Sequence, residues 1–186
     1  MRRRVRWFVI VAVVAIVGVV AAGVLIGPDI AKARDRVDAR WTRLREPLAT
    51  RYQALRAVAT AMHDAGAGDR AVTVDLDQAL ARWEKLALIG RAHADAAKET
   101  TTANELEALA RRLEANIARS DLLVTNTALG AAFLAFDQTY AEAFVPNIDA
   151  YNQAVRRYER ERSGALHRLV AGVLGYEARP LLVIGV

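Results

Sequence analysis

The chain contains no cysteine among its 186 residues. This absence excludes disulfide frameworks, thiolate nucleophiles, zinc sites of the cysteine type and the cysteine to which a lipoprotein's lipid is attached. A protein without cysteine is suited to either side of a membrane, so the composition does not choose a compartment.

Histidine is scarce as well, and its placement excludes the common metal motifs. None of the three histidines, His63, His93 and His167, has a carboxylate three residues before it, as a di-iron helical bundle requires. The acidic cluster Asp69–Asp77 lacks the spacing of a calcium loop, and it is interpreted as a helix start. No glycine-rich phosphate loop or nucleophile elbow is present. The sequence therefore predicts no catalytic, cofactor-binding or metal site, and a protein that is not an enzyme.

Charge is missing from a long stretch near the N-terminus. The 20 residues from Trp7, through Ile16 near the middle, to Ile26 carry no charge, and 13 of them are Val, Ile, Leu or Phe. As a helix rising ~1.5 Å per residue, the segment covers ~30 Å, the thickness of the hydrocarbon core of a bilayer. At roughly −0.3 to −0.6 kcal/mol for each large apolar residue, insertion is favoured by about 4 to 8 kcal/mol. Residues 7–26 are predicted to form a transmembrane helix.

A cleavable signal peptide is the alternative, with the small residues Ala21–Gly23 as the cleavage site. The apolar cores of such peptides are about 7 to 15 residues long, shorter than this segment. Cleavage would also leave the hydrophobic stub Val24–Ile26 at the new N-terminus. The retained anchor is the favoured interpretation.

The positive charge of the chain is concentrated in front of this segment. Four arginines lie within the basic flank of residues 1–6, whereas the rest of the chain carries 22 of the 26 basic residues and all 21 acidic ones. The folded part is therefore nearly neutral, which argues against nucleic acid as a partner. A tight basic cluster beside an apolar span favours a cytoplasmic N-terminus and an extracytoplasmic domain, although basic residues between Lys32 and Arg40 follow the span.

Apolar residues at helical spacing predict four long helices after the span. Gly27–Pro28 is expected to end the span, and Asp29 to cap a helix over about 30–64 that is bent by Pro47. Its predicted inner face repeats at steps of three and four residues. That face consists of Val37, Trp41, Leu44, Leu48, Leu55, Val58 and Met62.

The remaining helices are predicted from turns, capping patterns and a stripe of aromatic residues. After a turn at Gly66–Asp69, a second helix covers about 73–98, and Thr102 with Glu105 forms a capping box that starts the third. A break near Thr127–Gly130 precedes a last helix kinked at Pro146 and ending near Ser163. The aromatic stripe of this helix consists of Phe133, Phe136, Tyr140, Phe144, Tyr151 and Tyr158.

The predicted fold class is all-α, with an N-terminal transmembrane helix followed by an antiparallel up-down four-helix bundle with long helices. The bundle domain covers residues 30–164. Residues 165–186 form a C-terminal amphipathic segment and an apolar tail, and the conformation of Leu181–Val186 is left unassigned. The amphipathic segment either covers the end of the bundle, the favoured reading, or lies on the membrane surface.

Arg51 stands out because it occupies an inner-face position of the first bundle helix. An arginine there must reach solvent or pair with a buried acceptor. Candidate acceptors on the last helix are Glu142, Asp149 or a tyrosine hydroxyl. A role in fixing the packing register is favoured over ligand binding.

Several segments resemble the LemA family. The runs Arg36–Trp41 (RVDARW) and Arg51–Leu55, with Tyr52, resemble its opening. Residues Tyr151–Tyr158 (YNQAVRRY) resemble its Tyr-Asn-x-x-Val-x-x-Tyr-Asn segment, and Leu174–Pro180 its closing stretch. Glu159 stands where the family usually has a second asparagine, so this would be a divergent member. The resemblance implies a membrane-anchored antiparallel helical bundle, and the matching structural positions are Arg51, Tyr52, Tyr151, Asn152, Val155 and Tyr158.

Two functions are compatible with these features. The first is a non-enzymatic scaffold or interaction module at the cell envelope, in contact with the lipid bilayer, with other membrane or envelope proteins, or with a second copy of the chain as a homo-oligomer. The second is a membrane-tethered sensor that binds a small ligand between helices, with Arg51 as an anion contact. No cofactor is expected for either function.

Overall fold

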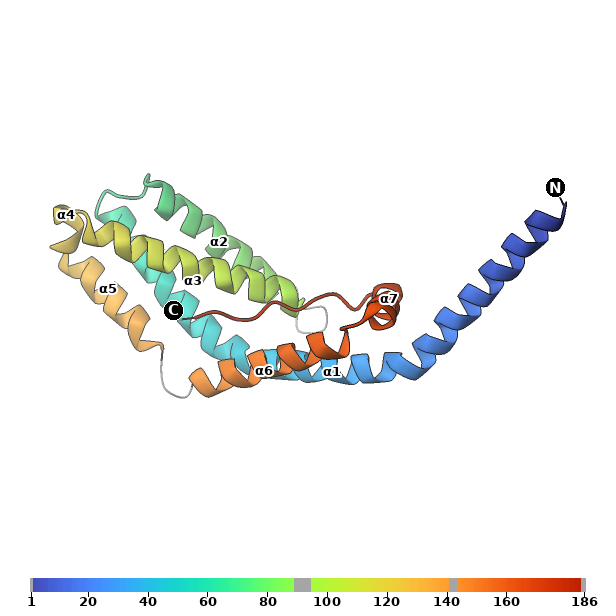
Figure 1. The fold of residues 1–186 in the computed structure, drawn as a ribbon. Coiled ribbons are helices and arrows are strands. Elements are labelled where there is room, and N and C mark those ends of the chain that lie inside the picture. The colour runs from blue at the N-terminus through green and yellow to red at the C-terminus, as the bar shows by residue number, and fades with distance from the viewer. Residues whose placement is uncertain (1, 89–94, 141–143, 185–186) are drawn as a thin grey trace. The chain divides into compact units, whose positions relative to one another are not determined.

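The described part of the chain is entirely helical apart from turns and the C-terminal tail. A computed structural model describes the backbone of residues 2–88, 95–140 and 144–184, and their side chains except for residues 2–6, 8–16, 19 and 20. Over these residues it contains seven helices and no strand (Figure 1). The all-α prediction is confirmed. The helices are α1 Arg2–Asp64, α2 Ala71–Leu88, α3 Ala96–Ala118, α4 Asp121–Val124, α5 Thr127–Gln138, α6 Val145–Glu161 and α7 Ala165–Val173.

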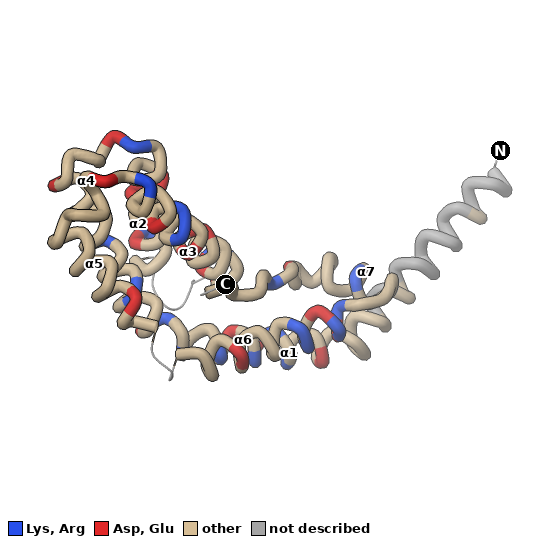
Figure 2. The backbone as a smooth tube through the Cα atoms, turned by 60° about the vertical axis from the view of Figure 1, so that its left-hand side comes forward, with Lys and Arg blue, Asp and Glu red and all other residues tan. Residues whose placement is uncertain are grey.

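The contacts within the chain divide it into two compact units. Unit 1 comprises Met1–Asp38 and Gln153–Arg179, and unit 2 comprises Ala39–Asn152 and Pro180–Val186. Both α1 and α6 contribute one part to each unit. Unit 2 contains the antiparallel pair α2 and α3, which lie side by side in Figures 1 and 2.

Helix α1 is continuous where the sequence predicted an end and a new start. It passes through Gly27–Pro28 without interruption, so Asp29 lies inside the helix and does not cap it. Pro47 also lies within the helix. A proline removes a single backbone donor, and the flanking hydrogen bonds keep a long helix intact. The predicted inner face is confirmed, since all seven of its apolar side chains are buried.

The turn after α1 is the one the sequence predicted. Gly66 adopts a positive φ of 72°, and its N–H donates to the His63 carbonyl at 2.9 Å. The Ala67 N–H donates to the Met62 carbonyl, also at 2.9 Å. This pair of bonds is the Schellman motif, in which a glycine ends a helix because other residues are strained at positive φ. Helix α2 is described up to Leu88, residues 89–94 of the predicted helix lie outside the described residues, and Ala96–Lys98 belong to α3.

The predicted capping box at the start of α3 is wrong. Thr102 and Glu105 lie inside the helix, and Asp95 is the capping residue. The Asp95 carboxylate accepts the Ala97 N–H at 3.0 Å and the Lys98 N–H at 3.3 Å. Hydrogen bonds from these N–H groups lower the pKa of Asp95, although partial burial acts in the opposite direction. An aspartate can cap a helix without the glutamate of the box motif. The capping-box pattern therefore predicted a helix start seven residues after the actual cap.

The predicted long last helix is two helices. Asn126 caps α5, and its side chain accepts the Leu129 N–H at 3.0 Å. Helix α5 ends at Gln138, and α6 begins at Val145, so Pro146 is the second residue of a new helix and kinks nothing. The first turn of a helix tolerates proline because its N–H groups have no partner within the helix. The end of α6 at Glu161 agrees with the predicted end near Ser163.

Candidate functional site

The charged pair Arg51–Glu107 is buried within unit 2. The Arg51 Nε donates to Glu107 Oε1 at 2.7 Å, and Nη2 donates to Oε2 at 2.9 Å. Arg51 is 5% exposed and Glu107 is 2% exposed. Both residues lie on the buried faces of their helices, α1 and α3, where the neighbouring positions are apolar. The two parallel N–H···O bonds match the planar guanidinium to the carboxylate, which is the strongest form of this pair.

Arg51 also connects these helices to α5. Its Nη1 donates to the Phe136 carbonyl at 3.3 Å and to Thr139 Oγ1 at 3.0 Å, and the guanidinium lies 3.9 Å from the centre of the Phe136 ring. A cation at the C-terminal end of a helix is favoured by the unpaired carbonyls there. Arg51 therefore fixes the positions of α1, α3 and α5 within unit 2.

The acceptor of Arg51 differs from those predicted. It is Glu107 on α3, whereas Asp149 on α6 is exposed and Glu142 lies outside the described residues. The guanidinium donors are directed at protein acceptors, so an anionic ligand at Arg51 would have to displace Glu107. This geometry favours the structural role of Arg51 over a ligand contact.

Tyr52 lies next to Arg51 and is a hydrogen-bond donor. Its hydroxyl donates to the Ala103 carbonyl at 3.2 Å, and its ring packs edge-on against Trp83, with 4.8 Å between the ring centres. Burial, followed by the negative charge of Glu107, raises the pKa of Tyr52 well above its usual value. The hydroxyl therefore keeps its proton and acts only as a packing donor near neutral pH.

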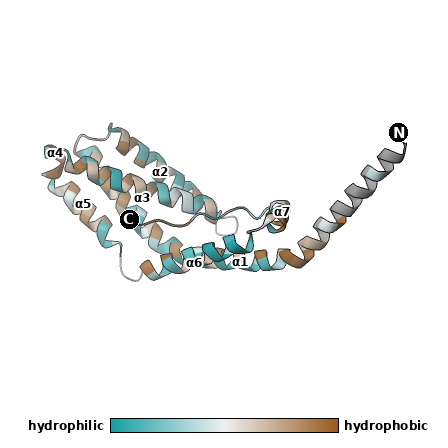
Figure 3. Ribbon diagram, in the orientation of Figure 1, coloured by the Kyte–Doolittle hydropathy of each residue, from teal (hydrophilic) through white to brown (hydrophobic). Residues whose placement is uncertain are grey.

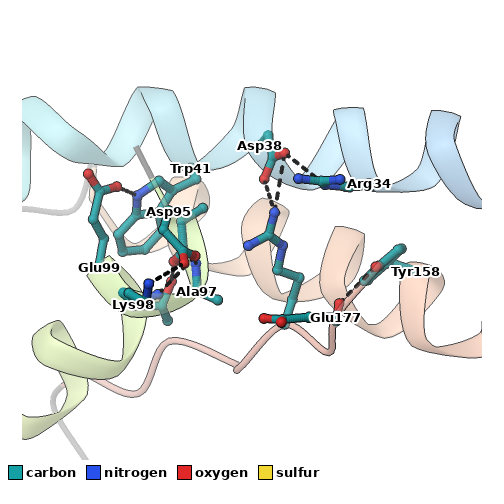
Figure 4. A network of polar contacts seen from close by, with 12 residues as sticks. Arg34, Asp38, Trp41, Asp95, Ala97, Lys98, Glu99, Tyr158 and Glu177 are labelled. Carbon is teal, nitrogen blue, oxygen red and sulfur yellow. Dashed lines mark hydrogen bonds and ion pairs between the residues drawn. The ribbon is translucent and has the colours of Figure 1, made fainter. Parts of the chain in front are cut away.

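A second buried carboxylate, Glu99, was not predicted from the sequence. It is 4% exposed, and it accepts the indole N–H of Trp41 (Figure 4). It also accepts the Arg45 Nε–H at 3.0 Å. The Trp41 ring packs against Tyr151, with 5.1 Å between the centres. A signal for it was available, because Glu99 continues the three-four spacing of the apolar residues of α3 toward the N-terminus. The same reasoning identified Arg51.

The resemblance residues Tyr151 and Asn152 contact the C-terminal tail. The Tyr151 hydroxyl bonds with Thr100 Oγ1 at 2.9 Å and donates to the Pro180 carbonyl at 3.0 Å. The Asn152 side chain donates to the Leu182 carbonyl and accepts the Leu182 N–H, both at 2.9 Å. The side-chain amide thus makes with Leu182 the same two hydrogen bonds that a residue of a neighbouring strand makes in an antiparallel sheet.

Asn104 on α3 holds the tail in the same way. Its side chain donates to the Leu181 carbonyl at 2.7 Å and accepts the Val183 N–H at 2.8 Å. The tail is extended, with Leu182 and Ile184 buried while Leu181 and Val183 are exposed, the alternation of a strand with one buried face. The conformation that the sequence left unassigned is therefore set, over the described residues 180–184, by side chains of α3 and α6.

The resemblance residues Val155 and Tyr158 belong to unit 1 and make different contacts. Both are buried, and the Tyr158 hydroxyl donates to the Glu177 carbonyl at 2.8 Å (Figure 4). Burial raises the pKa of Tyr158, so its hydroxyl stays protonated. Glu159, which departs from the family pattern, accepts the Arg179 backbone N–H at 3.0 Å. The Arg179 side chain reaches Asp38 on α1 at 3.1 Å.

The candidate residues thus form three separate sets of contacts. Arg51 and Tyr52 hold helices of unit 2, Tyr151 and Asn152 hold the tail, and Val155 with Tyr158 packs unit 1. Hydrogen bonds and ion pairs of this kind specify a packing arrangement. The contacts of the candidate residues therefore stabilise the packing of the helices and the tail.

The predicted span is covered only in part by the structure. Trp7 is 68% exposed and Ile26 is half-buried, whereas the side chain of Ile16 lies outside the described residues. Among the residues that are described, no helix is both long and apolar enough to cross a membrane. Most side chains of the segment Trp7–Ile26 are outside that set.

Removing the two asparagine side chains is expected to release the tail. Because Asn104 and Asn152 each supply two hydrogen bonds to the tail backbone, each substitution by alanine should cost about 1 kcal/mol or more. In the double variant, carboxypeptidase should remove the last residues several times faster than in wild type. Asn116→Ala, which removes a bond to Arg70 instead, is the matched control. Equal digestion of the double variant and the control would contradict the role assigned to the two asparagines.

Comparison of the chain with protein-family models, with curated proteins and with solved structures found no match.

Proposed function

We propose that this protein is a membrane-anchored helical-bundle protein of LemA type that acts as a non-enzymatic interaction module at the cell envelope. Residues 7–26 cross the cell membrane once, the N-terminus is cytoplasmic, and the helical domain stands on the outer side. The partners are the lipid bilayer and other membrane or envelope proteins.

The observation that carries the proposal is the continuity of α1. The uncharged segment Trp7–Ile26 belongs to the same helix that continues to Asp64. Further along this helix, buried residues such as Val37, Trp41 and Leu44 contribute to the cores of the two units. No loop separates the proposed span from the folded part, so the helix that enters the lipid also belongs to the domain.

The LemA resemblance supports the same proposal through the contacts of the matching residues. Tyr52, Tyr151, Asn152 and Tyr158 all direct their polar groups at backbone carbonyls of neighbouring segments. Such contacts maintain a bundle and its tail. They are what is expected of positions shared for architecture, and they leave the exposed surface to determine partners.

An exposed apolar surface at one end of unit 2 supports a role in protein interaction. No charged residue occurs from Leu122 to Phe136, which covers most of α4 and α5 (Figure 2). Leu122 is 84% exposed, Val124 is 59% exposed and Leu134 is 58% exposed. Exposed apolar side chains gathered on neighbouring helices mark surfaces that contact other molecules.

Site-specific photo-crosslinking tests the proposal. A photoreactive residue at Leu134 in the full chain, in its native membranes, should yield discrete adducts with another envelope protein or with a second copy of the chain. The same residue at Arg111, an exposed position on α3 next to the exposed Arg112, is the control and should yield few adducts. If Leu134 and Leu122 gave no adduct above the Arg111 control, this surface would not be an interaction site and the proposal would lose its support.

A further inference from the structure

The last helix, α7, is apolar on two faces. Val170 and Ala171 face inward and are buried within unit 1. On the other side, Leu166 is 49% exposed, Leu169 is 50% exposed and Val173 is 66% exposed. Residues spaced by three and four positions lie on one side of a helix. Leu166, Leu169 and Val173, called the α7 lipid face below, are therefore apolar positions on one side of α7 that unit 1 leaves about half exposed or more. Figure 3 colours α7 and the other helices by the hydropathy of each residue.

The C-terminal end of α7 lies against α1 just beyond the proposed span. The Leu174 Cδ1 atom would be 3.1 Å from a Cβ atom added at Gly27, so the Leu174 side chain packs closely against α1 at this position. Gly27 follows Ile26, the last residue of the uncharged segment. Arg34, two turns further along α1, lies over the Tyr176 ring at 5.4 Å. Both contacts join segments of unit 1, and they place the end of α7 at the level where the proposed span leaves the bilayer.

The direction of α7 is suitable for contact with a membrane surface. In Figure 1 the helix is seen nearly along its axis, whereas the part of α1 beside it runs across the picture. Within unit 1, α7 therefore crosses α1 instead of following it. A short helix that crosses a membrane-spanning helix at the end of the span lies parallel to the bilayer plane, where an amphipathic helix buries its apolar side among the headgroups.

The residues around this face carry little net charge. The α7 helix carries one arginine, Arg168, and no acidic residue. From Asp29 to Asp38 of α1, three basic residues, Lys32, Arg34 and Arg36, are balanced by three aspartates. With so little net charge, attraction to anionic lipid is weak, and the apolar side chains must supply the affinity.

We propose that the α7 lipid face inserts into the interfacial region of the bilayer beside the span and holds unit 1 against the membrane. This inference rests on the proposed function, because it requires that residues 7–26 are in the membrane. The occupant is the lipid of that membrane itself. The insertion depends on Leu166, Leu169 and Val173, and it is independent of anionic lipid.

Fluorescence in reconstituted membranes tests this proposal directly. The chain has no cysteine, so single cysteines at Leu169, Val173, Arg157 and Ile16 can each carry an environment-sensitive fluorophore. The full chain is reconstituted in phosphatidylcholine vesicles, with or without phosphatidylserine and with or without a lipid that carries a quencher near the headgroup. Arg157 is an exposed position on α6 and serves as the control.

Probes at Leu169 and Val173 should show blue-shifted emission and lose intensity with the shallow quencher, equally in both lipid mixtures. The Arg157 probe should show the emission wavelength that the fluorophore has in water, and it should not be quenched. If the α7 probes resembled Arg157 while the Ile16 probe was shielded from water, α7 would not touch lipid and the anchor would stand. If the Ile16 probe were also exposed to water, the anchor itself would be wrong. Blue-shifted but unquenched α7 probes would mean burial in protein, which also overturns the proposal.

Discussion

Replacing Arg51 with methionine is expected to lower the free energy of unfolding by about 3–5 kcal/mol, because the Glu107 carboxylate would remain buried without its partner. Both side chains are almost fully buried, so solvent does not screen the loss. For a chain of this size, about 2–4 °C of melting temperature is lost for each kcal/mol, which predicts a decrease of about 6–20 °C. Thermal unfolding of the full chain in detergent, followed by circular dichroism, measures it.

The double variant Arg51→Met/Glu107→Leu separates this explanation from a simple loss of packing. With both charges removed, most of the lost stability should return, since apolar residues of similar size replace a buried pair at little cost. The Phe136 carbonyl keeps the Thr139 hydroxyl as a donor at 2.6 Å, so it does not become unsatisfied.

Arg82→Met is the matched control for this prediction. It breaks the exposed pair with Glu105, a loss of at most about 1 kcal/mol. A loss in Arg51→Met no larger than in this control would show that the buried pair is not what holds the three helices.

Two arginines in the proposed span are expected to release the protein from the membrane. The span favours insertion by about 4–8 kcal/mol in total, and an arginine near the centre of a span costs about 2.5–3.5 kcal/mol in addition to the apolar residue it replaces. Ile16→Arg alone should therefore weaken insertion only in part. Val13→Arg/Ile16→Arg should cancel most or all of it, and the chain should move from the membrane pellet to the soluble fraction after an alkaline wash.

The matched control for this test is Val13→Leu/Ile16→Leu, which changes the same positions and keeps their apolar character. It should stay in the pellet as the wild type does. If the double arginine variant remained in the pellet, the chain would be held to the membrane by something other than residues 7–26. If the wild-type chain itself was washed off, the anchored function would be wrong.

The sequence predicted the helices of this protein better than their boundaries. The interior of a helix is indicated by many residues at once, so the apolar residues on both sides of Pro47 still predicted one helix. A boundary depends on one or two capping groups. Asp95 and the Thr102–Glu105 pattern were both adequate helix starts in the sequence, and only the path of the chain decided that Asp95 is the cap. The break between α5 and α6 was missed because the aromatic stripe continues across it.

The partners of the buried polar residues were less predictable. Arg51 was recognised because a charge at an apolar position is visible in one helix, but its acceptor required knowledge of which helix faces it. The tail is the clearest example. Its own residues contain no turn or cap, and its extended form depends on Asn104 and Asn152, which are 77 and 30 residues away from the backbone groups they bind.

The amino-acid sequence by itself determined that this protein is helical, that residues 7–26 are uncharged and long enough to span a bilayer, and which face of α1 is buried. These properties are local, since they depend on the periodicity and composition of one segment. Only the tertiary structure decided that Glu107 is the acceptor of Arg51, that side-chain amides hold the tail, and that the outer face of α7 stays exposed beside Gly27. Each of these depends on contacts between segments far apart in the chain, and no single segment contains them.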